Sequence, residues 1–344
     1  MSGTRRRKQV KLALQGGGSH GAFTWGVLDR LLEDERLEIE AVSGASAGAM
    51  NAAVLADGLQ AGGRAGARDA LRRFWTAVGR AAPGGWMHTF SGTDGTPAPL
   101  PMQWMAGWMA LWSPRSFLPG THALADIVRN TIDFDRVRRC NRVKVCISAT
   151  HVQTGALKLF RQHELSADAL MASACLPLLF GSVTVEGEAY WDGGFVGNPP
   201  LLPLMTEGST DDLVLVQINP SFRQAVPVTP RQILDRTNEI TFNGALLKDL
   251  RTLALVQAAL REEHEPGHVP PRRATLFRHV EALRLHRIDA EKALLGLGAG
   301  SKLDAGWPQL QRLHRIGRDA ADQWLQTHFT HLGRRGTVAL SQYA

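Results

Sequence analysis

The chain has 344 residues, 44% of them apolar and 21% charged, a composition typical of a globular protein with a sizeable core. No apolar run approaches the roughly 18 residues of a membrane-spanning helix, and the first one ends at Leu14, too soon for a secretory signal. The net charge of +7 comes mostly from arginines spread along the chain without a nucleic-acid-binding motif, so we expect a solvated basic surface and no nucleic-acid partner.

The first predicted elements are a buried strand over Val10–Leu14, a glycine-rich turn and an amphipathic helix. Within the turn, Gly16, Gly18 and Gly21 form the pattern G-x-G-x-x-G. This pattern is compatible with a loop that binds dinucleotide phosphates or with a tight turn that has no chemical role. A Walker loop is excluded, because no Gly-Lys-Ser/Thr follows.

The dinucleotide interpretation also needs an acidic residue at the end of the second strand, where it would bind the ribose hydroxyls. Glu38 and Glu40 lie near the required distance along the chain. The predicted strand Ile39–Val42 nevertheless continues past them into a glycine-serine turn, so the loop by itself does not decide between the alternatives.

A second motif follows that strand. The residues GASAG at 44–48 form G-x-S-x-G, and the small apolar residues after them predict a closely packed helix. A serine on a sharp strand-to-helix turn projects its hydroxyl clear of the sheet, and glycines on both sides, Gly44 and Gly48, let the backbones approach. This context predicts that Ser46 is a nucleophile.

A nucleophilic serine gives the first glycine loop a possible function. Attack on an ester creates a tetrahedral oxyanion, which needs amide hydrogen-bond donors. A run of glycines that opens a helix supplies such donors. Gly17 and Gly18 are the best candidates for this role, and Gly16 would shape the turn.

The segment between Gly84 and Phe117 is rich in tryptophan and methionine. Trp104, Trp108 and Trp112 recur every four residues, which predicts one face of a helix within residues 98–113. Such a helix could lie in a membrane interface, cover an acyl channel as a lid, or pack in the core. The sequence leaves these three alternatives open.

The remainder of the chain predicts two hairpins, one buried strand and a helical end. One hairpin joins Val143–Thr150 to Ala156–Phe160, and the other surrounds Glu186-Gly187. Leu213–Ile218 reads as a buried strand, and the pattern after Pro230 is helical nearly to the end. We therefore predict an α/β domain over residues 8–222 and a helical C-terminal region over residues 223–344 packed on it.

Asp192 ends the last strand of the second hairpin and precedes Gly193 and Gly194. An aspartate in this position is usually an exposed turn residue. The 12 histidines offer no obvious general base, because those of the C-terminal half lie in amphipathic segments where solvated or packed histidines are expected. Together with the two glycine motifs, Asp192 becomes a candidate base.

Taken in order, the three motifs resemble those of the patatin-like phospholipase family: G-x-G-x-x-G at 16–21, G-x-S-x-G at 44–48 and D-G-G at 192–194. The residues ASACLP at 172–177 and Asn198-Pro199 are also similar to that family, and the resemblance covers about residues 8–222. It implies a three-layer patatin-like α/β fold with a mainly parallel central sheet. It also implies a lipid acyl hydrolase of the phospholipase A type that needs no cofactor and no metal.

The resemblance further implies a Ser–Asp dyad without histidine, in which Ser46 is the nucleophile and Asp192 the general base. The oxyanion site would be formed by Gly16, Gly17 and Gly18. The motifs would be supported by His20, Gly21, Gly44, Gly48, Gly193 and Gly194. The substrate would be a phospholipid or another acyl ester.

The chain departs from the family at two positions: His20 stands where Arg or Lys is common, and Gln15 stands where Asp is common. His20 either assists the oxyanion or simply begins the helix. The proposed base also poses a difficulty, since an aspartate at its reference pKa of about 3.9 is a weak base for an alcohol. We expect burial beneath Trp191 and Tyr190 to raise the pKa of Asp192.

Two alternatives from other classes stay open on the sequence alone. One is a nucleotide-binding oxidoreductase that uses Gly16–Gly21, and the other is a non-catalytic membrane-associated scaffold. The sequence assigns no oligomeric state. Three cysteines without metal-ligand spacing suit a reducing compartment, so we predict a cytoplasmic protein. If the helix within residues 98–113 lies in a membrane interface, it would contact the inner membrane face.

Overall fold

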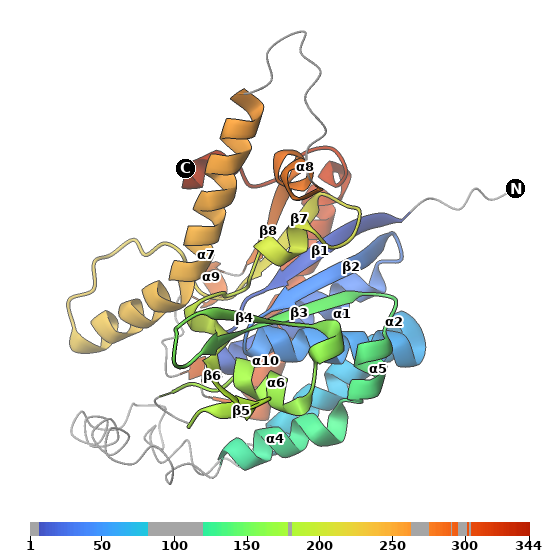
Figure 1. Cartoon of the computed structure of the whole chain (residues 1–344), viewed down its shortest axis with the longest axis vertical. Coiled ribbons are helices and arrows are strands. Elements are labelled where there is room, and N and C mark those ends of the chain that lie inside the picture. The colour runs from blue at the N-terminus through green and yellow to red at the C-terminus, as the bar shows by residue number, and fades with distance from the viewer. Residues whose placement is uncertain are drawn as a thin grey trace, which may run out of the picture.

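The structure is a computed structural model that describes residues 7–81, 120–177, 181–262, 275–289, 291–294, 301–302 and 304–344. Its described strands form one sheet with the order β5-β6-β3-β2-β1-β7-β8, and β4 also pairs with β3 (Figure 1). The strands are β1 Lys8–Leu14, β2 Leu37–Gly44, β3 Lys144–His151, β4 Leu157–Arg161, β5 Val183–Val185, β6 Glu188–Asp192, β7 Asp212–Gln217 and β8 Arg284–Asp289.

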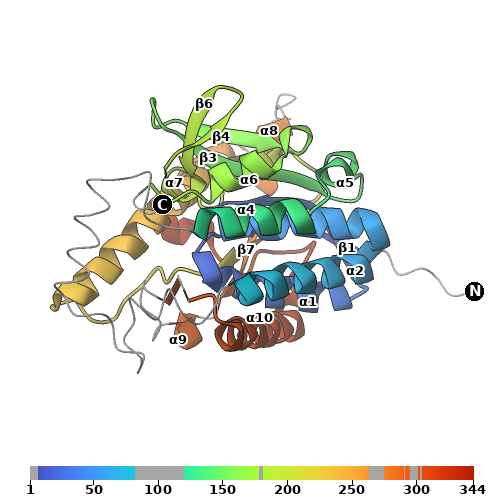
Figure 2. The same cartoon turned by 90° about the horizontal axis from the view of Figure 1, so that it is seen from below.

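Helices cover both faces of this sheet (Figures 1 and 2). The α-helices are α1 Gly21–Glu33, α2 Ala47–Ala81, α4 Gly120–Thr131, α5 Phe134–Arg139, α6 Ala167–Ser173, α7 Pro230–Glu262, α8 Thr275–Ala282, α9 Glu291–Leu294 and α10 Trp307–His328. The short 3-10 helices are η1 Gly18–His20, η2 Gln162–Glu164, η3 Gly193–Phe195, η4 Leu202–Met205, η6 Phe329–His331 and η7 Leu340–Tyr343. The helix α2 is interrupted by non-helical backbone at Gly62 and Gly63.

The predicted strands and the parallel sheet are confirmed. The neighbours β3, β2, β1, β7 and β8 pair in parallel, whereas both predicted hairpins, β3–β4 and β5–β6, are antiparallel. Parallel strands place their carboxyl ends at one edge of a sheet. The loops that follow β1 at Leu14 and β2 at Gly44 therefore lie next to each other, in register.

The three-layer architecture follows from alternation along β1. Leu12 and Leu14 face a core that contains α1, α2 and α10, while Ala13 faces a second core with side chains from α7 and α8. Figure 2 shows α10 lying alongside α1 on one face of the sheet. Within the described ranges, none of the helices combines the length and the hydropathy that a bilayer-spanning segment needs.

The C-terminal region differs from the expectation of helices only, because β8 extends the sheet beside β7. This strand carries Arg284 and His286, and polar residues of this kind do not indicate a buried strand from periodicity. These two polar side chains can lie in the strand because both bind the carboxylate of Asp212 on the neighbouring strand β7. The domain boundary at residues 222 and 223 stays a prediction, and residues 98–113 lie outside the described residues.

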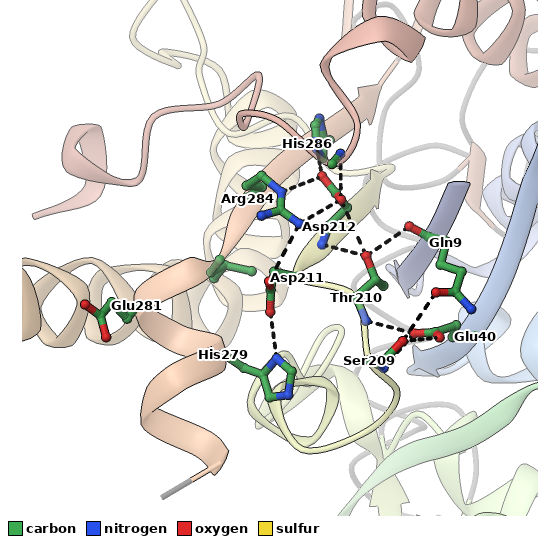
Figure 3. Close-up of polar contacts among 12 residues, drawn as sticks. Gln9, Glu40, Ser209, Thr210, Asp211, Asp212, His279, Glu281, Arg284 and His286 are labelled. Carbon is green, nitrogen blue, oxygen red and sulfur yellow. Dashed lines mark hydrogen bonds and ion pairs between the residues drawn. The ribbon is translucent and has the colours of Figure 1, made fainter. Parts of the chain in front are cut away.

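A polar network joins strands near their amino ends, away from the carboxyl edge (Figure 3). Asp212 accepts hydrogen bonds from Arg284 and from His286 Nε2, the latter at 3.0 Å. On the neighbouring side, the Glu40 carboxylate accepts the backbone amide of Thr210 at 3.0 Å. The network thus ties β7, β8 and β2 together with charge-assisted hydrogen bonds.

Candidate active site

Ser46 lies on a strained turn between β2 and α2. Its φ angle is +51°, in the left-handed region that residues with a side chain seldom adopt. The Ser46 amide donates to the backbone oxygen and to the hydroxyl of Ser173, at 3.1 Å and 3.0 Å. These hydrogen bonds hold the turn in the conformation that a nucleophile elbow requires.

The two glycines of G-x-S-x-G allow β1, β2 and α2 to meet at this turn. A Cβ atom on Gly44 would lie 2.5 Å from the carbonyl carbon of Gly48, and one on Gly48 would overlap the carbonyl oxygen of Leu14. Any larger residue would therefore push the first turn of α2 away from the sheet. The predicted reason for both glycines, close backbone approach, is confirmed.

Asp192 reaches the serine from the far side of β3. Its backbone is paired with Ala149 of β3, and β3 in turn pairs with β2 next to the elbow. The Ser46 side chain lies close enough to the Asp192 carboxylate to lower its pKa. Residues that are far apart in the sequence thus form a serine–carboxylate pair at one edge of the sheet.

The environment of Asp192 makes its carboxylate a stronger base. Only 1% of Asp192 is exposed, and this burial raises its pKa to about 6, although the hydrogen bond from the Gly194 amide and the nearby Ser46 side chain act in the opposite direction. The Gly194 amide donates to Oδ1 at 2.7 Å, and the backbone oxygen of Cys175 accepts the Asp192 amide at 2.8 Å. The predicted direction of the pKa shift is confirmed.

The glycines after Asp192 lie in tight surroundings. A Cβ atom on Gly193 would overlap the carbonyl oxygen of Ser148, and one on Gly194 would lie 2.7 Å from the ring of Phe242 on α7. Gly193 and Gly194 begin η3, and the Asp192 carboxylate caps this short helix by accepting the Gly194 amide. The D-G-G motif therefore packs the base against the sheet and against the C-terminal helix α7.

The first glycine loop borders the serine directly. A Cβ atom on Gly16 would lie 2.8 Å from Cβ of Ser46. The Gly16 amide is occupied, because it donates to Asn198 Oδ1 at 2.7 Å. Among the described residues, the amides of Gly17 and Gly18 donate to no acceptor. These two amides are therefore available to a bound oxyanion, whereas that of Gly16 is not.

The start of α1 completes the contact between the two motifs. A Cβ atom on Gly21 would lie 2.6 Å from Cβ of Ala47, so the amino ends of α1 and α2 touch. Asn51 bridges them, because its Nδ2 donates to the carbonyl oxygens of Gly21 and Ala47, each at 3.0 Å. Both helix dipoles thus direct their positive ends to the same region.

His20 is buried, and its Nε2 atom lies 2.9 Å from Oγ of Ser301. Burial, with a smaller contribution from the charge of Lys302, lowers the pKa of His20 to about 4. The imidazole is therefore neutral at pH 7. Its observed partner is a side chain of the C-terminal region, and its proposed supporting role is to join that region to the glycine loop.

Gln15, the second departure from the family pattern, joins the ends of β1 and β7. Its Oε1 accepts the amides of Ile218 and Asn219, each at 2.8 Å, and its Nε2 donates to Asn243 on α7 at 2.8 Å. A neutral amide both donates and accepts, which suits these partners. Gln15 therefore shapes the loop rather than supplying charge.

Several residues of the site were not assigned roles from the sequence. Asn198 was noted only as part of a similar motif, yet it holds the Gly16 amide in place. Ser173, within the ASACLP stretch, anchors the serine turn. Ser301 and Lys302 contact the loop from the C-terminal region, and no sequence signal connects them to it.

The dinucleotide interpretation of the loop lacks the acidic partner that it requires. Glu38 is exposed, and the Glu40 carboxylate is bound by Ser209 and Thr210 near the amino end of the strand. The last four residues of β2, 41–44, are uncharged. No acidic side chain of β2 is therefore placed to bind a ribose beside the glycine loop.

Replacing Gly18 by Ala should lower kcat by roughly 10²-fold, the usual loss when one oxyanion donor is displaced. Gly18 has a φ of +60°, and a Cβ atom there would overlap the carbonyl oxygen of Lys302. Gly155→Ala is the matched control, because Gly155 has a φ of +66° and no atom within 4 Å of its Cβ position. Steady-state kinetics check this, and equal kcat values for the two variants would contradict it.

Comparison with known proteins agrees with the motifs. The family model described as patatin-like phospholipase matches residues 12–205. A solved structure of VipD from Legionella pneumophila is similar at 16% identity, covering 94% of this chain and 67% of VipD with a TM-score of 0.45. A solved structure of ExoU from Pseudomonas aeruginosa, in complex with SpcU, is similar at 17% identity. The match covers 98% of this chain and 67% of ExoU, with a TM-score of 0.29. No curated protein matches the chain. Because the family model spans more than half of its residues, the chain belongs to the patatin-like phospholipase family.

Proposed function

We propose that the protein hydrolyses acyl esters of lipids, with Ser46 as the nucleophile and Asp192 as the general base. Family membership supports lipid acyl hydrolysis in general. The observation that carries the specific proposal is the position of the Ser46 side chain beside a buried carboxylate, close enough to influence its pKa, which burial raises to about 6. A carboxylate with that pKa is ionised at pH 7 and is a better proton acceptor than an ordinary aspartate.

The reaction begins when the Ser46 hydroxyl attacks the carbonyl carbon while its proton passes to Asp192. The tetrahedral oxyanion receives hydrogen bonds from the Gly17 and Gly18 amides, which are unoccupied among the described residues. Collapse breaks the ester bond, and Asp192 returns the proton to the departing alcohol or lysolipid. Water, deprotonated by Asp192, then hydrolyses the acyl-serine and restores the enzyme.

A fluorophosphonate probe tests this proposal, because it phosphonylates an activated serine. We expect stoichiometric labelling of the folded wild-type protein and complete loss of labelling in Ser46→Ala. Ser209→Ala is the control, since Ser209 is exposed and bonded to Glu40 near the amino ends of the strands. Its labelling should equal that of wild type. Folded wild-type protein that stays unlabelled would exclude the hydrolase function and favour the alternative of a non-catalytic membrane-associated scaffold.

Substrate access belongs to the same proposal. A Trp/Met helix within residues 98–113 would bring the protein to a phospholipid surface or cover the acyl channel, unless it packs in the core. A cytoplasmic location and contact with the inner membrane face remain predictions of the sequence. The chemistry at Ser46 does not depend on them.

A further inference from the structure

A small cavity lies beside the oxyanion loop. The cavity lining includes Ile218, His20, Glu239 and Lys302. A methyl carbon of Ile218 lies 3.1 Å from the position of a Cβ atom on Gly17, so the cavity begins directly behind the loop.

Lys302 places a cation at this cavity. Its Nζ atom donates to Asn238 Oδ1 at 2.8 Å and lies 5.7 Å from the centre of the Phe242 ring. No carboxylate of the described residues lies within ion-pair distance of this ammonium group. A partly buried lysine that is held by a neutral amide and an aromatic ring retains its capacity to bind an anion.

The remaining charges around the cavity do not cancel that of Lys302. Glu239 faces the same space, but its carboxylate is paired with both Arg223 and Arg236. Asp235 and Glu239 act on the Lys302 ammonium only as distant charges, and His20 is neutral at pH 7. The group available to a ligand is therefore cationic.

The Lys302 backbone fixes this cation relative to the catalytic loop. Its carbonyl oxygen lies against Gly18, where a side chain would overlap it. The preceding residue, Ser301, accepts a hydrogen bond from the Ser19 hydroxyl at 3.0 Å through its carbonyl oxygen. Lys302 and the oxyanion amides thus belong to one packed unit. Such an arrangement is required if the ester and a second group of the same substrate are to be bound at the same time.

We propose that Lys302 binds the phosphate of a glycerophospholipid while the ester of that lipid lies at Ser46. The inference rests on the proposed hydrolase function and makes Lys302 the residue that favours phosphate-bearing esters over neutral ones. In a glycerophospholipid the phosphate is separated from the scissile ester by only a few bonds. Lys302 is anchored beside the oxyanion loop, and its ammonium group lies 5.7 Å from the centre of the Phe242 ring, which packs against Gly194 next to Asp192. Its positive charge is complementary to the phosphate.

The test compares two soluble substrates with identical acyl groups, dihexanoyl phosphatidylglycerol and dihexanoylglycerol, which lacks the phosphate. In Lys302→Met we expect KM for the phospholipid to rise about tenfold, the usual effect of losing one charge-assisted hydrogen bond, with little change for the neutral ester. Lys302→Arg keeps the charge and should keep most of the preference. Lys144→Met, at an exposed position that begins β3, is the control.

The pH dependence of KM for the phospholipid distinguishes phosphate binding by Lys302 from a purely structural role, which would not change this dependence. Burial lowers the pKa of Lys302 to about 8, so the ammonium loses its proton as the pH rises through that value. KM of wild type for the phospholipid should therefore rise between about pH 7 and pH 9, and KM of Lys302→Arg should not, because arginine stays charged. The neutral ester serves as the internal reference for both proteins.

Equal changes of KM for both substrates, or no change for either, would overturn the proposal for Lys302 while hydrolysis of the neutral ester still supports the function at Ser46. Absence of hydrolysis of both substrates by wild type would instead reject the function itself. Should Lys302→Met not fold, sn-glycerol 3-phosphate provides the second test. It should inhibit wild-type hydrolysis of the neutral ester competitively, and a lack of inhibition at millimolar concentration counts against the site.

Discussion

Replacing Asp192 by Asn should lower kcat/KM for a neutral ester by roughly 10³-fold, because the amide has the shape of the carboxylate but cannot accept the serine proton. The Gly194 amide still finds an oxygen acceptor, so the local fold is kept. Asp249→Asn is the matched control, since Asp249 on α7 also has a pKa raised by burial and accepts a backbone amide. Steady-state kinetics on all three proteins decide the matter, and comparable losses in both variants would remove Asp192 from the chemistry.

The same carboxylate predicts the acid limb of the pH profile. As the proposed base, Asp192 would accept the serine proton only when ionised, and its pKa is raised to about 6. We therefore expect log kcat/KM to fall with unit slope below about pH 6 and to level off above it. An aspartate at its reference pKa of about 3.9 would keep full activity down to pH 5. A plateau that persists to pH 4.5 would show that the base is a different group or that it is solvated.

Ionisation of Asp192 should have opposite effects on activity and stability: as the pH rises, activity should increase and the free energy of unfolding should decrease. A folded-state pKa above the unfolded value means that the protonated carboxyl is favoured by folding, so its contribution is complete below about pH 4 and is lost as the pH rises through about 6. Asp192→Asn should therefore be more stable than wild type at pH 8, by up to about 3 kcal/mol. The difference should vanish at pH 3.5, as measured by urea unfolding.

A second large effect concerns stability. Asp212→Asn should lower the free energy of unfolding by about 3 kcal/mol at pH 7, because it removes the charge that pairs with Arg284 at 3.0 Å beside fully buried His286 and leaves Arg284 only Asp211 at 3.7 Å. Burial raises the pKa of Asp212, but the hydrogen bonds from His286 and Arg284 outweigh it, so the net shift is downward. Urea denaturation of wild type and variant gives the difference directly.

Asp211→Asn is the matched control for this prediction (Figure 3). Asp211 is more exposed than Asp212 and binds His279 at 2.7 Å and Arg284 at 3.7 Å, so its loss should cost about 1 kcal/mol or less. A lowered folded-state pKa adds stability above the unfolded pKa and loses it as the pH falls. The difference between wild type and Asp212→Asn should therefore shrink below about pH 4. A pH-independent difference would attribute the loss to packing.

Much of the fold was accessible to sequence reasoning because local patterns dominate there. The run Val10–Leu14 is apolar and ends in glycines, so β1 and the following turn have one reasonable interpretation. The hairpin pairing of β3 with β4 follows from a short turn between two strand-forming runs. In contrast, β8 mixes arginine and histidine with leucine and isoleucine, and only its partner β7 explains it.

The sequence by itself determined the chemistry of the candidate site: a serine in a glycine-flanked strand-to-helix turn, an aspartate before two glycines, and a glycine loop that can expose amides. It could not determine which groups meet. The pairing of Asp192 beside β3 carries that carboxylate to Ser46, and the same packing buries it and raises its pKa. Two further contacts could be known only from the tertiary structure: the Gly16 amide donates to Asn198, and Lys302 packs against the glycine loop. Distances between residues far apart in the chain depend on the whole packed sheet, whereas turn chemistry depends on neighbours in sequence.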